Sequence, residues 1–366
     1  MKKIYISIIA AALLSTGAMA ESNTIKEAFA NGKASGDISI YAENVSASGT
    51  NKDSGFSVGS IGLNYETDSI NGFKANLGFR TNHKLNEKEE ADYDESAPKS
   101  VLNTANISYS TDKAEIIVGR QEIDLEWMGD FHEAVVGVFN YVPDTTILVG
   151  HSTKFMAADA DTSLEEMGEF GTDNNGATVI DAKYEGVTDT VINPYYIDVK
   201  DTFSAYGLKA TTSISNIDLT AHYAATSEDL TDTKDGSIAH LEIGTTVSDI
   251  ALKVGYITTD KDGGAQSLTT LGENIAPTED IDDSVYGIDA DSFYVGAETE
   301  ISSISFSALY TSVNHGVNDD KDTEILLTAG TTLDENLALD LLISSASYED
   351  STNDTDKVTV MATYSF

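Results

Sequence analysis

Carboxylates and apolar side chains alternate in one short stretch of the sequence, residues 121–130. Carboxylates on one face of such a segment attract cations, whereas apolar side chains between them need a surface to pack on. We therefore expect the segment to fold onto an inner wall, with its carboxylates toward water and the only tryptophan packed behind them. A plain surface loop on a hairpin is the alternative. The candidate residues are Glu122, Asp124, Glu126, Trp127 and Asp130.

Basic residues form the second candidate group, because they lie in segments where apolar and polar side chains alternate. Lys74 and Arg80 fall on the face opposite Phe73, Leu77 and Phe79. Acids and bases facing each other across a narrow wet passage would create a transverse field that orients dipolar solutes. Alternatively, these charges only pair and keep the passage wet. The predicted inward-facing bases are Lys74, Arg80, Arg120, Lys183, Lys209 and Lys253.

Histidines could support hydrolysis, and six occur in the chain. They are scattered, although His222 and His240 are predicted to face the same interior from neighbouring strands. No serine nucleophile motif accompanies them. Ordinary polar lining is therefore the favoured interpretation, and the sequence predicts no catalytic residue and no enzyme.

Two acidic stretches, 260–263 and 318–322, crowd carboxylates enough to suggest calcium. Neither has the ligand spacing of the twelve-residue calcium loop. Solvated loops are favoured, so the sequence predicts no cofactor and no metal ligand, with calcium in the acidic loops as the weaker alternative.

The alternation itself has a period of two and recurs from residue 36 onward in segments of about ten residues. In 217–223, apolar residues occupy every second position, and Asp218, Thr220 and His222 stand between them. Such segments predict strands with one apolar and one polar face. In a membrane barrel the apolar face meets lipid, and the polar face lines a water-filled interior.

About eighteen such segments can be counted, and their connections alternate between short turns and long acidic loops. This alternation is typical of transmembrane barrels with short periplasmic turns and long external loops. The sequence therefore predicts an all-β, antiparallel, up-and-down transmembrane β-barrel. The predicted strands are 36–45, 56–66, 71–81, 101–110, 113–121, 132–141, 145–153, 176–185, 188–197, 202–212, 215–225, 237–247, 249–259, 291–299, 302–313, 323–332, 336–347 and 357–366.

Both ends of the sequence carry features typical of targeting signals. Residues 1–20 combine two lysines, an apolar run and small residues near position 20, which predicts an export signal. Residues 21–35 would follow as a short periplasmic segment, either a short helix or a disordered tail, before a barrel over 36–366. The last strand alternates strictly and ends on Tyr364 and Phe366, which predicts a signal for the barrel assembly machinery.

Composition excludes several classes of protein. After the export signal, no stretch reaches the 18 or more consecutive apolar residues of a membrane-spanning helix. There is no linker between domains, and there are no cysteines, so disulfides do not contribute to stability. The net charge of −40 would repel nucleic acid.

Several stretches resemble the Opr family (OprD-like) of bacterial outer-membrane porins. The segments 118–124 and 131–136 resemble the fifth strand and constriction loop of that family, and 25–33 and 193–196 resemble other parts. The resemblance implies an eighteen-stranded barrel, relatives that admit amino acids, small peptides or carboxylates, and a basic ladder that includes Arg120. This chain departs from the pattern, because it has only two arginines and is strongly acidic.

We therefore expect an outer-membrane porin that lets ions and other small hydrophilic solutes diffuse passively, with a preference for cations. Expected partners are outer-membrane lipids and lipopolysaccharide, the assembly machinery and small solutes, but not nucleic acid; a homotrimer is one option. An outer-membrane hydrolase and a structural or adhesive envelope protein are the alternatives.

Overall fold

Antiparallel strands make up most of the computed structural model, which describes residues 22–49, 51–170, 175–272, 275–316 and 320–366. The strands are β1 (Lys33–Ala47), β2 (Phe56–Glu66), β3 (Phe73–Glu87), β4 (Ser100–Ser110), β5 (Ala114–Glu122), β6 (Phe131–Phe139), β7 (Thr145–Met156), β8 (Gly168–Glu169), β9 (Ala177–Val187), β10 (Thr190–Val199), β11 (Phe203–Ile214), β12 (Ile217–Glu228), β13 (Ser237–Val247), β14 (Ile250–Thr259), β15 (Asp291–Ile301), β16 (Ile304–His315), β17 (Asp320–Asp334), β18 (Leu337–Ser347) and β19 (Thr355–Ser365). The short helices are α2 (Ile25–Ala30), η1 (Gln266–Leu271), α3 (Asp282–Val285) and η2 (Ser351–Asn353).

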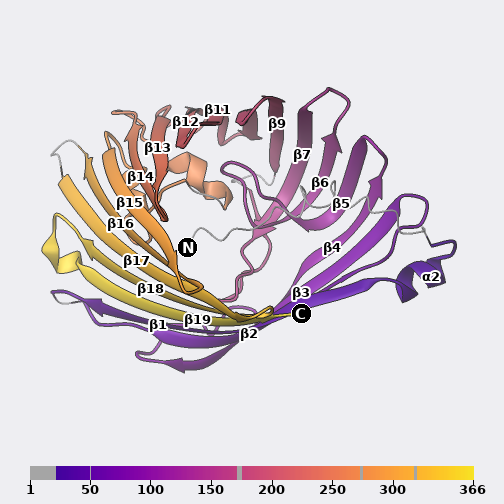
Figure 1. Ribbon diagram of the computed structural model, residues 1–366, viewed down its shortest axis with the longest axis horizontal. Helices are drawn as coiled ribbons and strands as arrows, with labels where there is room; N and C mark the ends of the chain where they lie inside the picture. The colour runs from indigo at the N-terminus through magenta and orange to yellow at the C-terminus, as the bar shows by residue number, and fades with distance from the viewer. Residues whose placement is uncertain (1–21, 50, 171–174, 273–274, 317–319) are drawn as a thin grey trace.

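The sheet closes on itself. Strands adjacent in sequence pair in antiparallel fashion, and β1 also pairs with β19, so Tyr41 lies opposite Val58 on one side and Met361 on the other. Of the 19 strands, β8 is a two-residue extension paired with β7, which leaves an 18-stranded barrel wall (Figure 1). This confirms the predicted barrel, and each predicted segment overlaps one of the long strands.

One rim of the barrel carries tight turns. Ser302 and Ser303, between β15 and β16, both have positive φ, 52° and 66°. Positive φ at both central residues is the requirement of a type I′ turn, whose twist matches that of the paired strands. Most connections at the opposite, external rim are longer, as predicted, but residues 200–202 join β10 to β11 by a short one.

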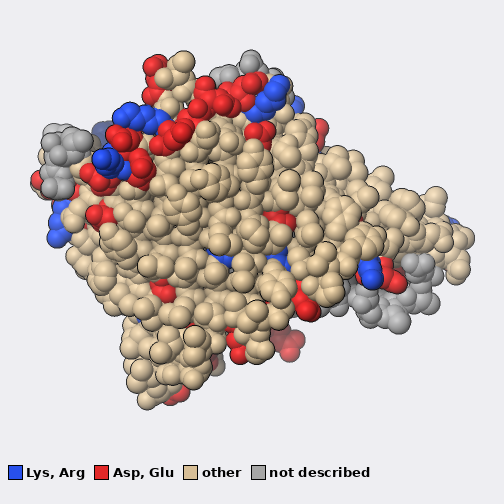
Figure 2. Space-filling model, turned by 90° about the horizontal axis from the view of Figure 1, so that it is seen from above, with Lys and Arg blue, Asp and Glu red and all other residues tan. Residues whose placement is uncertain are grey.

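The outer wall is apolar. Val118, Leu241 and Ile325 are 51%, 59% and 50% exposed, and alternation turns them away from the interior. In Figure 2 charged side chains gather along one edge, and the wall below that edge is largely free of them. Apolar side chains facing outward over a closed ladder suit hydrocarbon, because neighbouring strands pair their backbone groups all the way around the barrel.

The first described residues form a helix. The hydroxyl of Thr24 caps α2 by accepting a hydrogen bond from the Glu27 N–H, at 3.2 Å. The barrel begins at Lys33, slightly before the predicted residue 36. The predicted export signal, residues 1–20, lies outside the described residues. In the described part of the chain, no helix is long and apolar enough to cross a membrane.

At the other end, Tyr364 and Phe366 stack on each other with ring centroids 6.4 Å apart. The Phe366 N–H and C=O both bond to Gly36 of β1, so this end is part of the barrel seam. The assembly-signal role of the two aromatics stays a prediction.

Candidate functional site

The third external connection, L3 (residues 123–130), turns back on itself inside the barrel. The Ile123 N–H donates to the Asp130 carbonyl at 2.9 Å, and the Leu125 N–H donates to the Met128 carbonyl at 2.9 Å. Trp127 and Asp130 both have positive φ, 67° and 69°. A bulky side chain seldom adopts this conformation, so surrounding contacts must hold L3 in place.

Trp127 anchors L3 to the inner wall. Its side chain is fully buried, and its indole N–H donates to the Tyr195 hydroxyl of β10 at 2.7 Å. The Tyr195 oxygen lies 2.6 Å from Nε2 of His222 on β12. Because an indole nitrogen only donates, the Tyr195 oxygen accepts from Trp127, which leaves the hydroxyl hydrogen free for His222. Two strands that are far from L3 in the sequence, β10 and β12, thus converge on Trp127.

The lumen side of L3 carries two of the predicted carboxylates. Glu126 pairs with Lys209 of β11 at 2.5 Å. Burial raises the pKa of the Asp124 carboxyl, and Glu126 raises it further, whereas Lys183 and Lys209 lower it. Both carboxylates therefore act together with the bases of the wall behind L3, rather than with bases on the opposite wall.

Glu122 and Arg120 do not join this group. Both belong to β5, where alternation places them on the same face as Val118, which is exposed on the outer wall. The prediction that both point into the lumen is corrected by this register. Arg120 lies opposite Glu133 and 3.5 Å from its carboxylate, and no bulge intervenes between Arg120 and Val118 to reverse the face.

A second loop, which the sequence pattern did not indicate, enters the lumen. The connection between β14 and β15, L7 (residues 260–290, described except 273–274), contains η1 and α3 and lies inside the ring of strands in Figure 1. The Gly129 N–H of L3 donates to the Leu271 carbonyl of L7 at 3.0 Å. The overlooked signal was a set of apolar residues within an acidic loop, all now buried: Leu268, Leu271, Ile281, Val285 and Tyr286.

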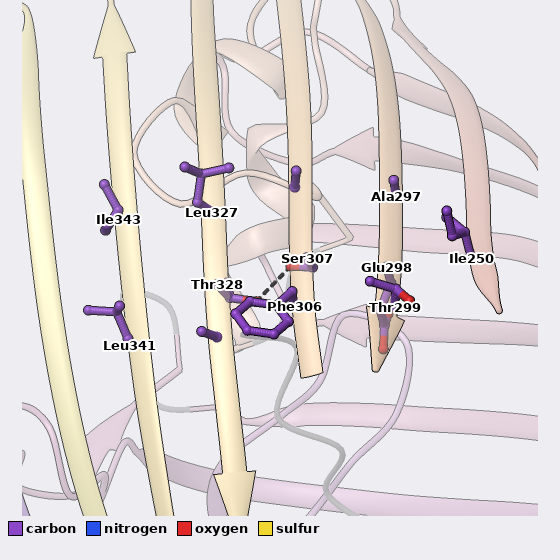
Figure 3. A pocket seen from close by; sticks show the side chains of 12 residues that line it. Ile250, Ala297, Glu298, Thr299, Phe306, Ser307, Leu327, Thr328, Leu341 and Ile343 are labelled. Atoms are coloured by element: carbon purple, nitrogen blue, oxygen red, sulfur yellow. Dashed lines mark hydrogen bonds between the residues drawn. The ribbon is translucent and has the colours of Figure 1, made fainter. Parts of the chain in front are cut away.

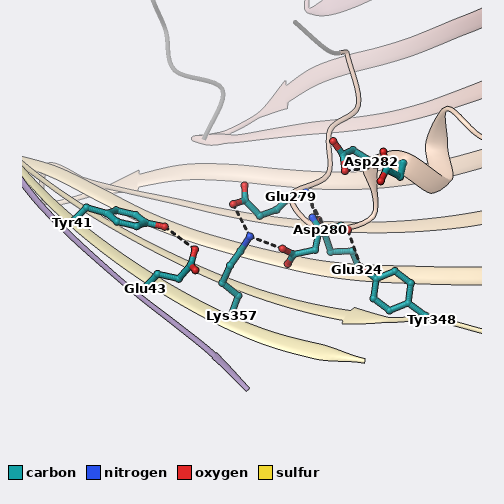
Figure 4. Close-up of polar contacts among 9 residues, drawn as sticks. Tyr41, Glu43, Glu279, Asp280, Asp282, Glu324, Tyr348 and Lys357 are labelled. Carbon is teal, nitrogen blue, oxygen red and sulfur yellow. Dashed lines mark hydrogen bonds and ion pairs between the residues drawn. The ribbon is translucent and has the colours of Figure 1, made fainter. Parts of the chain in front are cut away.

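L7 is fixed to the wall by polar contacts from two strands and a loop (Figure 4). The carboxylate of Glu324 on β17 is fully buried and accepts hydrogen bonds from the backbone N–H groups of Glu279 and Asp280, at 2.9 and 2.6 Å. Lys357 of β19 pairs with the side chains of the same two residues. The Tyr348 hydroxyl donates to the Asp280 carbonyl at 2.8 Å.

Removing the acceptor at the centre of this attachment should loosen L7. In Glu324→Gln, half of the side-chain acceptor capacity becomes an NH2 group, which would face backbone donors. Leaving a buried donor unpaired costs about 1–3 kcal/mol. We expect single-channel recordings to show added conductance levels or flicker. The β-sheet content of the folded barrel should stay unchanged. Steady, wild-type-like currents would show that Lys357 and Tyr348 are sufficient to hold L7 against the wall.

The fourth external connection adds a further inward contact. The side-chain amide of Asn82 on β3 donates to the carbonyls of Asp159 and Thr162, both at 2.7 Å. Phe170 of the same connection stacks on His132 of β6, with centroids 5.8 Å apart. Segments from three external connections therefore narrow the interior, whereas the sequence singled out only L3.

Three of the predicted lumen bases, Lys74, Arg80 and Lys209, each form an ion pair with a carboxylate. Arg80 forms a two-pronged pair with Asp37, with nitrogen–oxygen distances of 2.9 and 2.7 Å. Lys74 pairs with Glu66 at 2.8 Å. Gly62, between Asp37 and Arg80 in the register, makes room for the first pair, because a Cβ there would lie 2.6 Å from the Asp37 carboxylate. Within the part of the chain that the structure describes, these bases do not form an uninterrupted ladder.

Two lumen bases form no ion pair with a carboxylate within the described residues. Lys183 is exposed on the inner face of β9, and Lys253 lies 5.9 Å from the centre of the Tyr294 ring. The inward-facing carboxylates on the strands outnumber these two bases. Several of the carboxylates have no lysine or arginine pair in the described structure, including Glu115, Asp181, Asp218, Glu242, Glu298, Glu324 and Asp340.

The histidines and acidic loops form no metal site in the described residues. His222 and His240 are direct cross-strand neighbours, but their partners are Tyr195 and Tyr294. No group of three or more histidines, aspartates or glutamates in the described part is placed to hold a metal ion. In the first predicted calcium stretch, the Asp260 carboxylate accepts backbone N–H groups from its own turn. Residues 318 and 319 of the second stretch lie outside the described residues.

A hollow of about 500 Å³ lies on the barrel wall at strands β14–β18 (Figure 3). Its lining includes Phe306, Leu327 and Ile343, which are exposed large apolar side chains, together with Ala297 and Ala308. By alternation these side chains face outward, so the hollow belongs to the lipid-facing surface and not to the passage.

No known protein-family profile matches this sequence, and no curated protein matches it. Solved structures do match. Pseudomonas aeruginosa OccK3 (OpdO) gives a TM-score of 0.77 at 13% identity, over 93% of this chain and 97% of that one. Acinetobacter baumannii OccAB4 gives 0.74 at 14% identity, over 91% and 98%. P. aeruginosa OpdK with vanillate gives 0.72 at 11% identity, over 91% and 98%.

These structural neighbours are outer-membrane channels of the OprD-like family, and this chain shares their fold. The closed 18-stranded wall with its apolar exterior makes it an outer-membrane protein. The fold predicted from the resemblance is thus confirmed.

Proposed function

We propose that this protein is a passive diffusion channel for small hydrophilic solutes. A barrel of 16–18 strands is wide enough to enclose water, whereas eight strands would be filled by side chains. The inner wall supports this, because it carries charged and hydrogen-bonding groups such as Asp37 on β1, Arg80 on β3 and Asn106 on β4. The similarity of the fold to OccK3 (OpdO) and OccAB4 also supports a channel.

Within that function, we propose a preference for cations. The observation that carries it is the pairing inside the barrel: Lys74, Arg80 and Lys209 are neutralised by carboxylates, while further inward carboxylates have no basic partner in the described residues. In a narrow, partly desolvated passage, such an excess raises the local concentration of cations and lowers that of anions. OpdK was solved with vanillate, a carboxylate. The charge balance here argues for cations and zwitterions instead.

Reversal potentials across a planar bilayer with a KCl gradient test this proposal. We expect conductance steps and a potential of the sign given by K⁺ moving more readily than Cl⁻. High salt on both sides should reduce the preference, because it screens the wall charges. Absence of conductance steps from correctly folded barrels would reject the channel. A reversal potential of the opposite sign would reject only the cation preference.

A further inference from the structure

Four charged side chains lie next to one another on successive strands near the external rim. Arg120 on β5 is opposite Glu133 on β6, and Glu133 is opposite Lys154 on β7. Lys154 is in turn opposite Glu169 on β8. Cross-strand neighbours point to the same side of a sheet. The four residues therefore form one row of alternating charge, which we call the outer charged row.

The outer charged row faces away from the lumen. Arg120 and Val118 share one face of β5, and Glu133 and Val135 share one face of β6; both valines are 51% exposed on the outer wall. His132, the neighbour of Glu133, is completely buried on the opposite, lumen side. The row is thus part of the surface that meets the membrane.

The position of the row along the strands matches the external edge of the membrane. Below it, toward the tight turns, the same face carries Ile116, Val118, Val135 and Val149, all exposed. Above it, β5 ends two positions further on, at Glu122. Charges on a lipid-facing wall are costly at mid-membrane and cost little near the interface. The barrel is therefore most stable with this row at the level of the outer headgroups.

The ion pairs within the row are loose. Arg120 Nε lies 3.5 Å from a Glu133 oxygen, and Lys154 Nζ lies 3.5 Å from a Glu169 oxygen, both longer than a charge-assisted hydrogen bond. One guanidinium N–H of Arg120 donates to the Leu102 carbonyl at 2.8 Å, which fixes the group against the wall. A guanidinium has five N–H donors, so others remain available to a ligand.

We propose that the outer charged row binds the phosphate groups of a glycolipid in the external leaflet. The planar guanidinium of Arg120 suits a two-pronged contact with one phosphate, and the Lys154 ammonium suits a second. Glu133 and Glu169 hold the two bases apart and accept hydrogen bonds from sugar hydroxyls. The apolar wall beneath offers a surface to acyl chains. Bases above an apolar face fit an amphiphile with a phosphorylated head rather than a soluble anion.

Binding of bisphosphorylated lipid A to the full barrel in detergent micelles tests this site. A basic residue beside an anionic lipid strengthens binding about fivefold, so R120Q/K154Q should weaken it roughly 30-fold, and K154Q alone about fivefold. The matched control is K52Q/K234Q, which removes the same charge from lysines paired with acids on external loops. The control should bind like the wild type. Dephosphorylated lipid A should bind the wild type as weakly as the double variant binds lipid A.

Equal lipid A affinity in the double variant and its control would overturn the proposal. So would equal affinity of the wild type for the dephosphorylated lipid. A self-complementary row of alternating charge also fits a second copy of this chain. If the wild type is an oligomer in lipid-free micelles and R120Q/K154Q is a monomer, the row is a protein interface and the lipid site is rejected. K154Q keeps the test informative if the double variant does not fold.

Discussion

Replacing Asp124 by Asn and Glu126 by Gln together should reduce the ratio of K⁺ to Cl⁻ permeability at least about threefold. The variant removes two negative charges from L3, and one of them, on Glu126, is the charge that neutralises Lys209 at 2.5 Å in the wild type. A lysine charge released into a narrow passage repels cations, so the sign of the preference can invert. Reversal potentials should be measured above neutral pH, because burial raises the pKa of Asp124.

Glu122→Gln is the matched control for this variant. It removes a charge of the same sign from a residue adjacent to L3, but on the outer face of β5. We expect its reversal potential to equal that of the wild type. If Glu122→Gln changed selectivity as strongly as the double variant, the register-based assignment of Glu122 and Arg120 to the outer face would be wrong. If the double variant changed nothing, ion selection would occur away from L3.

Replacing Trp127 by Ala should detach L3 from the wall and increase single-channel conductance. Truncation of a buried tryptophan typically costs about 3–5 kcal/mol. Here it also removes the indole donor to Tyr195 and the edge contact with Tyr286, whose ring centre is 6.0 Å away. An alanine at a φ of 67° keeps the backbone strain without the contacts that offset it. Larger and noisier conductance steps are therefore the expected result.

Thermal unfolding separates this effect from a general loss of stability. The barrel wall rests on its strand ladder, in which L3 has no part, so the Trp127→Ala barrel should still unfold cooperatively. Tyr206→Ala, an aromatic residue on the outer wall, serves as the control and should leave conductance unchanged. Trp127→Phe keeps most of the packing but loses the N–H donor, so its conductance should lie between those of the wild type and the alanine variant. Wild-type currents in Trp127→Ala would show that L7 alone holds L3.

The barrel is predictable from the amino-acid sequence alone, because its signal is local. A period of two places Ile217, Leu219 and Tyr223 on one face whatever the partner strand is, and lipid outside the barrel requires that face to be apolar. The same local pattern indicated an inward L3, since apolar residues between carboxylates have no reason to stay in water. It also indicated the alternation of tight turns and longer loops.

The composition of the constriction, in contrast, depends on tertiary contacts. That L7 meets L3 at Leu271 and Gly129 depends on a contact between segments far apart in the sequence, and no local period encodes it. Arg120 was misassigned because the family resemblance prevailed over alternation, whereas the regular register with β4 and β6 turns it outward. The partners of Arg80 and Lys209 likewise emerge only when the closed barrel and its loops bring Asp37 and Glu126 to them. Charge balance inside a barrel is set by pairing across strands and loops, and pairing is a property of the fold.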